Sequence, residues 1–144
     1  MVSVNVNGLL YVAHAALPHL LKAAEGEPRR VSDLVNVSSV AGRRARSDSA
    51  VYNATKFAVN AFTEGLRQEV TERHVRVSVV EPGAVATELS SHNRDEIRAQ
   101  IKERFGDVDR LEAADIADAI GYVVTRPRHV AINEVLIRPT EQEQ

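Results

Sequence analysis

The 144-residue chain has no cysteine and almost no net charge, and both absences narrow its chemistry. Without cysteine it can form neither a disulfide framework nor a thiolate metal site. Its five histidines show no close ligand spacing, so we expect no metal ion. The formal net charge of −2 gives no electrostatic reason to expect a nucleic acid or an anionic membrane as partner. We therefore expect neither a nucleic-acid nor a membrane partner.

The sequence also lacks a targeting segment or a membrane span, although residues 1–24 are apolar. This stretch has no basic leader, and it is interrupted by Asn5, Asn7, His14, Pro18 and His19. Its leucine, valine and alanine side chains cover more than one face, which predicts a helix over 3–24 that is packed on several sides. We expect a cytoplasmic protein.

Hydrophobic patterning predicts an α/β fold. Short apolar runs typical of buried strands lie at 31–39, 75–83 and 131–139. Helices are expected over 3–24, about 50–73, 91–105 and 112–125. Because the connections are long enough for right-handed parallel crossovers, we expect about three parallel strands with flanking helices in three layers. With 44% apolar and 26% charged residues and no internal repeat, residues 1–144 are predicted to form one domain.

The stretch AVYNATKFAV places Tyr52 and Lys56 four residues apart at the start of the second predicted helix. Residues at this spacing share a helix face, so the phenol and the ammonium can reach one point. A free phenol has a pKa near ~10, and a neighbouring positive charge favours the phenolate, which makes tyrosine usable for proton transfer near neutral pH. By itself the pair is a weak signal, because such a pair is more often an ordinary helix surface.

Polar residues also end two of the predicted strands. Ser39 lies at the end of the first strand, and the E-P-G segment at 81–83 ends the second. In open parallel sheets, ligands bind beyond the carboxyl ends of the strands. We therefore expect Ser39, this segment and the Tyr52–Lys56 pair to lie at one edge of the sheet.

Taken together, four motifs resemble the short-chain dehydrogenase/reductase family, and they occur in the family's order. They are VNVNG at 4–8, LVNVSSVAG at 34–42, YNATK at 52–56 and VRVSVVEPGAVATEL at 75–89. The interval of thirteen residues from Ser39 to Tyr52 also fits the family. The resemblance runs from about residue 2 to the C-terminus. It implies a partial Rossmann-like fold and hydride transfer between a nicotinamide cofactor and a carbonyl or hydroxyl substrate.

The resemblance implies a catalytic tetrad of Asn5, Ser39, Tyr52 and Lys56. Tyr52 is the expected acid or base, and Lys56 is expected to lower its pKa and to bind the nicotinamide ribose. Ser39 is expected to hold the substrate oxygen. Asn5 is expected to interrupt its helix and to anchor a water that connects Lys56 to solvent. Its spacing from the next glycine makes it a better match to the motif than Asn7.

The resemblance also implies cofactor contacts in the turn after the second strand. The family lines the nicotinamide and binds its carboxamide with the residues found here at Pro82, Gly83, Val85 and Thr87, and glycine permits close backbone approach. The tail at 117–144 resembles NADP-dependent reductases of small hydroxy acids and amino-acid side-chain alcohols. We therefore expect NADP as cofactor, with NAD as the alternative. Family members use helices for oligomer contacts, so we expect a homodimer or homotetramer.

The family's phosphate-binding signature is missing from this sequence. No T-G-x-x-x-G-x-G turn occurs among the 144 residues, and Met1 already lies in an apolar helix. We interpret the chain as the catalytic half of a Rossmann-fold reductase that lacks the N-terminal glycine-rich half. The strand at 31–39 should then have an unpaired edge, and the helix at 3–24 should lose much of its packing surface.

Two other functional interpretations stay open at this point. A truncated, catalytically inactive family member would act as a dimerisation or binding module. A Ser/His hydrolase is disfavoured because the sequence lacks a G-x-S-x-G motif.

Several individual residues also have a plainer structural interpretation. Ser39 could cap a turn, and Asn5 could be a buried amide or a helix cap. An exposed basic loop is usually solvated but could attract a substrate carboxylate, and this applies to Arg43, Arg44 and Arg46. Candidates for the start of a substrate lid are Leu89, Ser90 and Ser91.

Overall fold

The computed structural model describes residues 1–87, 96, 99, 106 and 108–143, and its elements follow the predicted order. The elements are η1, a π-helical turn (Ser3–Gly8), α1 (Leu9–Glu25), β1 (Ser32–Val37), η2, a 3-10 turn (Val40–Gly42), α2 (Ala50–Val70), η3, a 3-10 turn (Thr71–Arg73), β2 (Val75–Pro82), α4 (Ala113–Val124) and β3 (Glu134–Ile137). The helix expected over 91–105 falls outside the described residues except at positions 96 and 99, and so do Leu89, Ser90 and Ser91.

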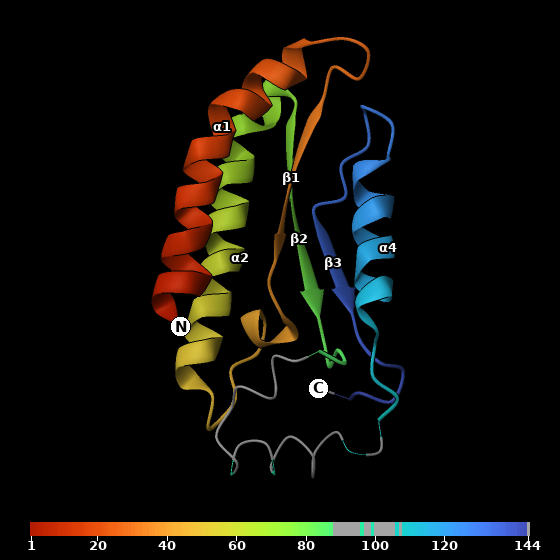
Figure 1. The fold of residues 1–144 in the computed structure, drawn as a ribbon. Coiled ribbons are helices and arrows are strands. Elements are labelled where there is room, and N and C mark those ends of the chain that lie inside the picture. Colours follow the sequence, from red (N-terminus) through yellow and green to blue (C-terminus); the bar gives the residue numbers. More distant parts are fainter. Residues whose placement is uncertain (88–95, 97–98, 100–105, 107, 144) are drawn as a thin grey trace.

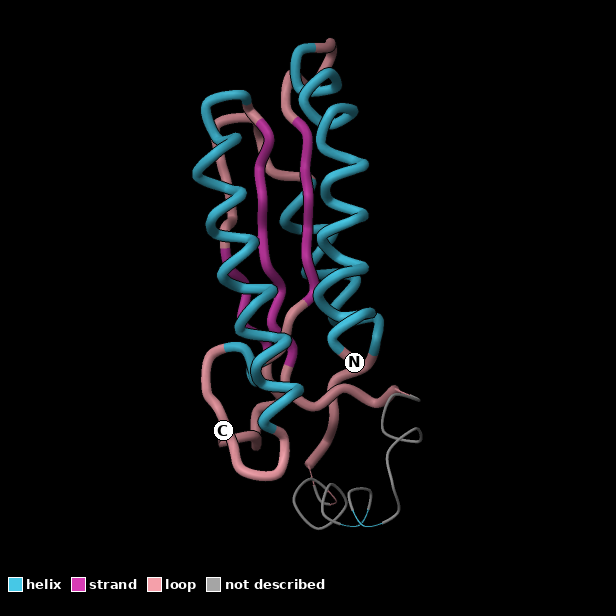
Figure 2. The backbone as a smooth tube through the Cα atoms, turned by 90° about the vertical axis from the view of Figure 1, so that its left-hand side faces the viewer, coloured by secondary structure: helices cyan, strands magenta, loops and turns pink. Residues whose placement is uncertain are grey.

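The three strands form one parallel sheet in the order β1-β2-β3. β1 pairs with β2 from Ser32↔Val75 to Val37↔Val80, and β2 pairs with β3 from Val79↔Glu134 to Pro82↔Ile137. Helices α1 and α2 cover one face of this sheet, and α4 covers the other (Figures 1 and 2). The predicted α/β, Rossmann-like fold with three layers is confirmed.

β2 is the central strand, and all eight of its residues are buried. Its valines at 75 and 77 belong to the core beneath α1 and α2, together with Ala13, Ala24, Leu66 and Val70. The intervening side chains lie on the α4 face, because successive side chains alternate across a strand. There the Ser78 hydroxyl donates to the carbonyl of Ile132 at 2.6 Å. Both faces of β2 are therefore covered, and its buried polar side chains Arg76, Ser78 and Glu81 each have a hydrogen-bond partner.

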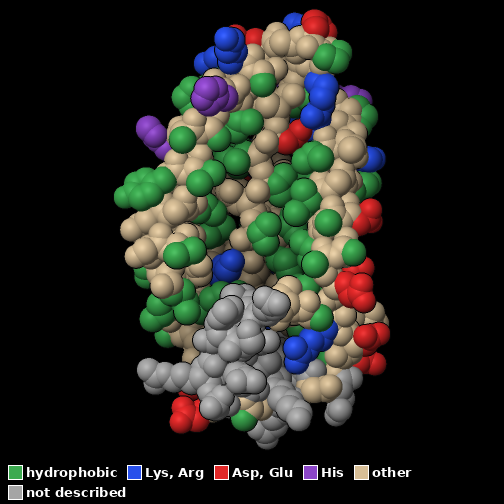
Figure 3. All heavy atoms as spheres, viewed as in Figure 1, with side chains coloured by type: hydrophobic (Ala, Val, Ile, Leu, Met, Phe, Trp, Pro, Cys, Tyr) green, Lys and Arg blue, Asp and Glu red, His purple; other side chains and the backbone are tan. Residues whose placement is uncertain are grey.

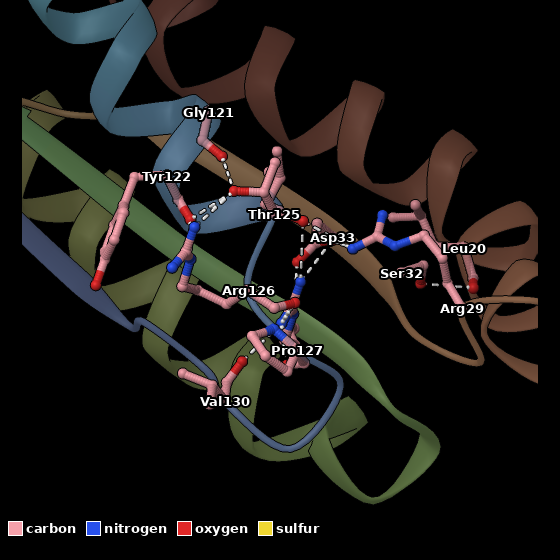
Figure 4. Close-up of polar contacts among 12 residues, drawn as sticks. Leu20, Arg29, Ser32, Asp33, Gly121, Tyr122, Thr125, Arg126, Pro127 and Val130 are labelled. Carbon is pink, nitrogen blue, oxygen red and sulfur yellow. Dashed lines mark hydrogen bonds and ion pairs between the residues drawn. The ribbon is translucent and has the colours of Figure 1, made fainter.

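A buried ion pair, which we call the Arg76 cluster, closes the end of the sheet where the strands begin. Arg76 Nε donates to Asp33 Oδ1 at 2.6 Å and Nη2 to Asp33 Oδ2 at 3.0 Å, and the two side chains are only 7% and 8% exposed. Arg76 Nη1 donates to three carbonyls of the segment between α4 and β3, those of Arg126, Pro127 and Val130 (Figure 4). The cluster thus fixes that segment to the first two strands.

α1 packs on one side only within this chain, in line with the expected loss of much of its packing surface. Of its residues only Ala13 and Ala24 are buried, while Tyr11 is 73% and Val12 66% exposed. The helix meets the sheet and α2 along one face, and hydrophobic side chains gather over α1 and beside the sheet edge in Figure 3. β1 is the edge strand of the described sheet, as expected. Among the described residues, no helix is long and apolar enough to cross a membrane.

Candidate active site

The four sequence motifs meet at one end of the sheet, beyond the carboxyl ends of the strands. Ser39 follows β1, and Pro82 ends β2. Tyr52 and Lys56 lie in the first turns of α2, and Asn5 lies in η1. Figure 1 shows the N-terminus and the start of α2 at the end toward which the strand arrows point. This is the edge at which open parallel sheets bind ligands.

Tyr52 and Lys56 lie side by side, as their spacing predicts. Lys56 Nζ lies 5.7 Å from the centre of the Tyr52 ring. The same amine donates to the carbonyl of Val37, the last residue of β1, at 3.3 Å. The Tyr52 hydroxyl has no hydrogen-bond partner among the described residues, although the side chain is half-buried. The phenol is therefore held next to a cation with its oxygen available.

Burial lowers the pKa of Lys56 below its ordinary value, because a partly desolvated ammonium loses hydration. Its single hydrogen bond, to one backbone carbonyl, replaces only part of the lost water contacts. A nearby phenolate or hydroxyl oxygen would compensate more of this cost. The electrostatics of Lys56 therefore favour an oxygen ligand close to Tyr52.

Ser39 caps a turn, which is the structural role that the sequence allowed for it. It is the N-cap of η2, and its hydroxyl accepts from the backbone N–H of Ala41 at 3.2 Å. The hydroxyl also donates to the carbonyl of Pro82 at 3.4 Å. Ser39 therefore links the turn after β1 to the end of β2. The described residues show no hydrogen bond between its hydroxyl and Tyr52.

Asn5 faces α2, whereas Asn7 is exposed. Asn5 Nδ2 donates to Thr55 Oγ1 at 3.2 Å, and Thr55 Oγ1 donates in turn to the carbonyl of Tyr52 at 2.8 Å. The helix around Asn5 is π-helical over Ser3–Gly8, a wider geometry that is frequent at functional sites. The expected interruption of the helix is thus present at Asn5, and it brings this residue to the helix that carries the pair.

The turn after β2 uses most of its backbone donors internally. The N–H of Gly83 donates to Ile137 at 2.7 Å, that of Ala84 to Gln142 Oε1 at 2.8 Å, and that of Ala86 to Leu111 at 2.8 Å. The amide of Val85 has no acceptor among the described residues. A Cβ at Gly83 would collide with the side chain of Gln142. The glycine therefore leaves room for the Gln142 side chain, which accepts from the amide of Ala84. Thr87 is exposed at the edge of the described range.

Arg43 forms an ion pair with the fully buried carboxylate of Glu81, a contact that sequence reasoning missed. Arg43 Nε donates to Glu81 Oε2 at 2.6 Å, and Glu81 is fully buried. Hydrogen bonding to Glu81, and then to Glu134, raises the pKa of Arg43. Arg43 is thus neither merely solvated nor free for a substrate carboxylate. The signal in the sequence was Glu81 itself, because a carboxylate inside an apolar strand needs a cationic partner.

The sequence of this chain is similar to those of known oxidoreductases. Residues 1–98 match the family model for short chain dehydrogenase. An uncharacterised oxidoreductase of Staphylococcus epidermidis is 39% identical over 139 residues, which are 96% of this chain and 54% of that protein. One of Staphylococcus aureus is 36% identical over 141 residues, 96% of this chain and 53% of that protein. The chain spans about half the length of the curated relatives it matches.

Solved structures give the same result. A serine dehydrogenase complexed with NADP+ superposes with a TM-score of 0.87 and 30% identity, covering 100% of this chain and 56% of that one. A 3-oxoacyl-[acyl-carrier protein] reductase of Brucella melitensis with bound NAD has a TM-score of 0.72 and 27% identity, covering 95% of this chain and 48% of that one.

Proposed function

The chain belongs to the short-chain dehydrogenase family, and we propose that it carries the catalytic residues of a nicotinamide-dependent oxidoreductase that interconverts an alcohol and a carbonyl. The observation that carries this proposal is the half-buried Tyr52 phenol beside Lys56 Nζ, at 5.7 Å from the ring centre, at the ligand-binding edge of a parallel sheet. Acid/base chemistry needs a titratable oxygen that is not already bound to protein, and Tyr52 offers one.

In the direction of reduction, the Tyr52 hydroxyl gives its proton to the substrate carbonyl oxygen, which becomes the alcohol oxygen. In oxidation, the Tyr52 phenolate takes the hydroxyl proton. The positive charge of Lys56 favours the phenolate in both directions. Ser39 holds the substrate oxygen, and Asn5 anchors the water that returns protons from solvent toward Lys56. These roles follow the family motif residue by residue.

The residues present fit the nicotinamide end of a dinucleotide cofactor. Lys56 has one carbonyl partner, so it retains donors for ribose hydroxyls. The amide of Val85 has no acceptor among the described residues, whereas the amides at 83, 84 and 86 do, and Val85 would hold the carboxamide beside Pro82, Gly83 and Thr87. When bound, the cofactor supplies or accepts the hydride.

The finer features of the proposal follow from the relatives. We favour NADP over NAD because the serine dehydrogenase with a TM-score of 0.87 was solved with NADP+, although the Brucella reductase holds NAD. For the same reason we propose a small hydroxy-amino acid or related alcohol as substrate. A homodimer or homotetramer in the cytoplasm completes the proposal. The pyrophosphate site is assigned to a glycine-rich segment outside these 144 residues, because they contain no T-G-x-x-x-G-x-G turn.

The test joins this chain to the glycine-rich half of the Staphylococcus epidermidis relative and measures NADP+ reduction with serine and other small alcohols. Tyr52→Phe should lower kcat by roughly 100-fold to 10,000-fold, since only the transferable proton is lost, while NADPH binding stays nearly unchanged.

Tyr122→Phe is the matched control, because Tyr122 is an exposed tyrosine on α4 and its loss should leave the rate unchanged. A Tyr52→Phe protein that keeps most of its rate contradicts the assignment of Tyr52. The 144-residue chain by itself should show no saturable NADPH fluorescence change, and tight binding would overturn the assignment of the phosphate site to another segment.

A further inference from the structure

The end of the sheet that carries Tyr52 and Lys56 also contains a fully buried carboxylate, that of Glu81, one residue before Pro82. The Glu81 carboxylate is fully buried, and it accepts from Arg43 Nε at 2.6 Å and from Asn60 Nδ2 at 2.6 Å. Arg43 Nη2 also donates to Glu134 Oε2 of β3 at 2.5 Å. Glu81 of β2 therefore contacts the turn after β1 through Arg43 and helix α2 through Asn60, and Arg43 extends the link to β3.

The same residues hold the turn that carries Ser39. Asn60 Nδ2, besides its bond to Glu81, donates to the carbonyl of Gly42 at 3.1 Å. Gly42 ends η2, and a Cβ there would lie 2.9 Å from the backbone oxygen of Lys56. The Ser39 turn is therefore pressed directly against the helical turn that carries Lys56. Because that contact is to backbone, it leaves the turn little freedom to shift.

The energetics indicate that this arrangement serves more than stability. Glu81 is a fully buried charge, and its desolvation cost offsets much of what its ion pair with the partly exposed Arg43 contributes to stability. Asn60 Oδ1 is also a buried oxygen without a hydrogen-bond partner among the described residues. Such an oxygen costs desolvation free energy. That cost is compensated by the two bonds from Nδ2, which orient the amide toward Glu81 and Gly42.

We propose that Arg43, Glu81 and Asn60 are positioning residues that hold the Ser39 turn against α2. They set the place of the Ser39 hydroxyl relative to Tyr52 and Lys56, and Arg43 acts through Ser39 without touching substrate. The structural part of this inference stands on the contacts alone. Its catalytic consequence rests on the proposed function.

The first experiment measures amide hydrogen exchange in the 144-residue chain and needs no turnover. The amides of Ala41 and Gly42 donate to Ser39 Oγ and to the Ser39 carbonyl. Arg43→Gln should speed exchange at both amides by roughly tenfold, while the amides of β2 keep their protection. Arg44→Gln is the matched control, and it should leave exchange at both amides unchanged. Unchanged protection in Arg43→Gln would overturn the proposal. Because Arg43→Gln leaves the buried Glu81 carboxylate without its cation, the double variant Arg43→Gln/Glu81→Gln, which removes both charges, is measured beside it. Faster exchange at both amides in the double variant, with β2 still protected, supports the proposal, and unchanged protection overturns it.

The second experiment uses the joined protein and a double-mutant cycle. Arg43→Gln should lower kcat roughly tenfold with an unchanged KM for NADP+, and Arg43→Lys should restore part of the rate. In a Ser39→Ala background, Arg43→Gln should have no further effect, because the residue it positions is gone. If the loss of kcat in the double variant is the product of the losses in the two single variants, the two residues act independently and the proposal is overturned. Failure of the Tyr52 test leaves the exchange result intact, so the two proposals fail separately.

Discussion

The Arg76 cluster and the Tyr52–Lys56 pair lie at opposite ends of the sheet and differ in how many of their hydrogen-bonding groups have a partner in the chain. Where the strands begin, Arg76 is 7% exposed and makes hydrogen bonds to Asp33 and to backbone carbonyls of the α4–β3 segment. Where the strands end, Lys56 has one carbonyl partner, and the Tyr52 hydroxyl has none among the described residues. The first arrangement is complete within the chain, whereas the second leaves donors and acceptors for a ligand.

This difference distinguishes a structural charge from a functional one. A buried guanidinium is stable only when the protein satisfies all of its donors, and removing one partner leaves an uncompensated charge. A catalytic phenol must keep its oxygen available, which leaves part of its hydrogen-bonding capacity unused in the folded chain. The two ends therefore predict opposite results when their side chains are replaced.

The largest expected effect comes from breaking the Arg76 cluster. Asp33→Asn keeps the shape of the side chain but removes the charge that neutralises Arg76, so the free energy of unfolding should fall by about 3–5 kcal/mol. Urea unfolding followed by circular dichroism measures this change. Glu25→Gln is the control, because it breaks an exposed pair with Arg73 at 2.9 Å and should cost less than about 1 kcal/mol. If both variants lose the same unfolding free energy, the buried pair is worth no more than the exposed one and the comparison fails.

A smaller loss is expected where the catalytic end is packed most tightly. Gly42→Ala places a methyl group 2.8 Å from Ser38 Oγ and 2.9 Å from the Lys56 carbonyl oxygen. Overpacking of this kind should cost about 1–3 kcal/mol in urea unfolding. Gly65→Ala, inside helix α2, meets nothing within 4 Å and should instead raise the free energy of unfolding by about 0.5–1 kcal/mol. A change of the same sign in both variants would falsify the packing argument.

The contribution of Asn5 should be smaller still. Asn5→Ala removes the bond from Nδ2 to Thr55 Oγ1 at 3.2 Å, whereas Asn7→Ala changes an exposed side chain in the same helical turn. Because both variants gain similar helix propensity, the difference between their unfolding free energies isolates the bond, at about 0.5–1.5 kcal/mol. If the two variants unfold at the same urea concentration, Asn5 does not anchor the N-terminal turn to α2.

Replacement of Lys56 should cost no stability near neutral pH. Burial lowers the pKa of Lys56 in the folded chain, so the unfolded chain binds the proton more tightly. The unfolding free energy of the wild type should therefore rise as pH increases from the lowered pKa toward the ordinary value near ~10.4. Lys56→Met should lack this rise and be at least as stable as the wild type at pH ~7, where the ammonium is charged. Urea midpoints measured against pH test it. A clear loss of stability at neutral pH shows that Lys56 is a structural residue.

Much of the fold follows from patterns that a single segment contains. Apolar residues bounded by polar or turn-forming residues predicted all three strands, although β2 also buries Arg76, Ser78 and Glu81. The spacing from Tyr52 to Lys56 predicted their shared face, because helix geometry is local. Ser39 and the turn after Pro82 were expected at one edge, because parallel strands end on the same side of a sheet.

Other features depend on partners that local sequence does not identify. Apolar side chains on several faces of the N-terminal helix do not identify which of those faces find a partner within this chain, and Tyr11 and Val12 stay exposed. Arg43 was expected to be solvated or to attract a substrate carboxylate, since its loop sequence carries no sign of Glu81, 38 residues away. The close approach of Gln142 to Gly83 was likewise not expected, because the two residues are far apart in the sequence.

The sequence by itself determined the three-layer α/β fold, the family and the identity of the candidate acid/base pair, since these depend on periodicity and on short motifs. The tertiary structure decided which charges are satisfied and which are left for a ligand. Hydrogen-bond saturation depends on distances between segments that are far apart in the chain, and those distances exist only after the strands and helices have packed.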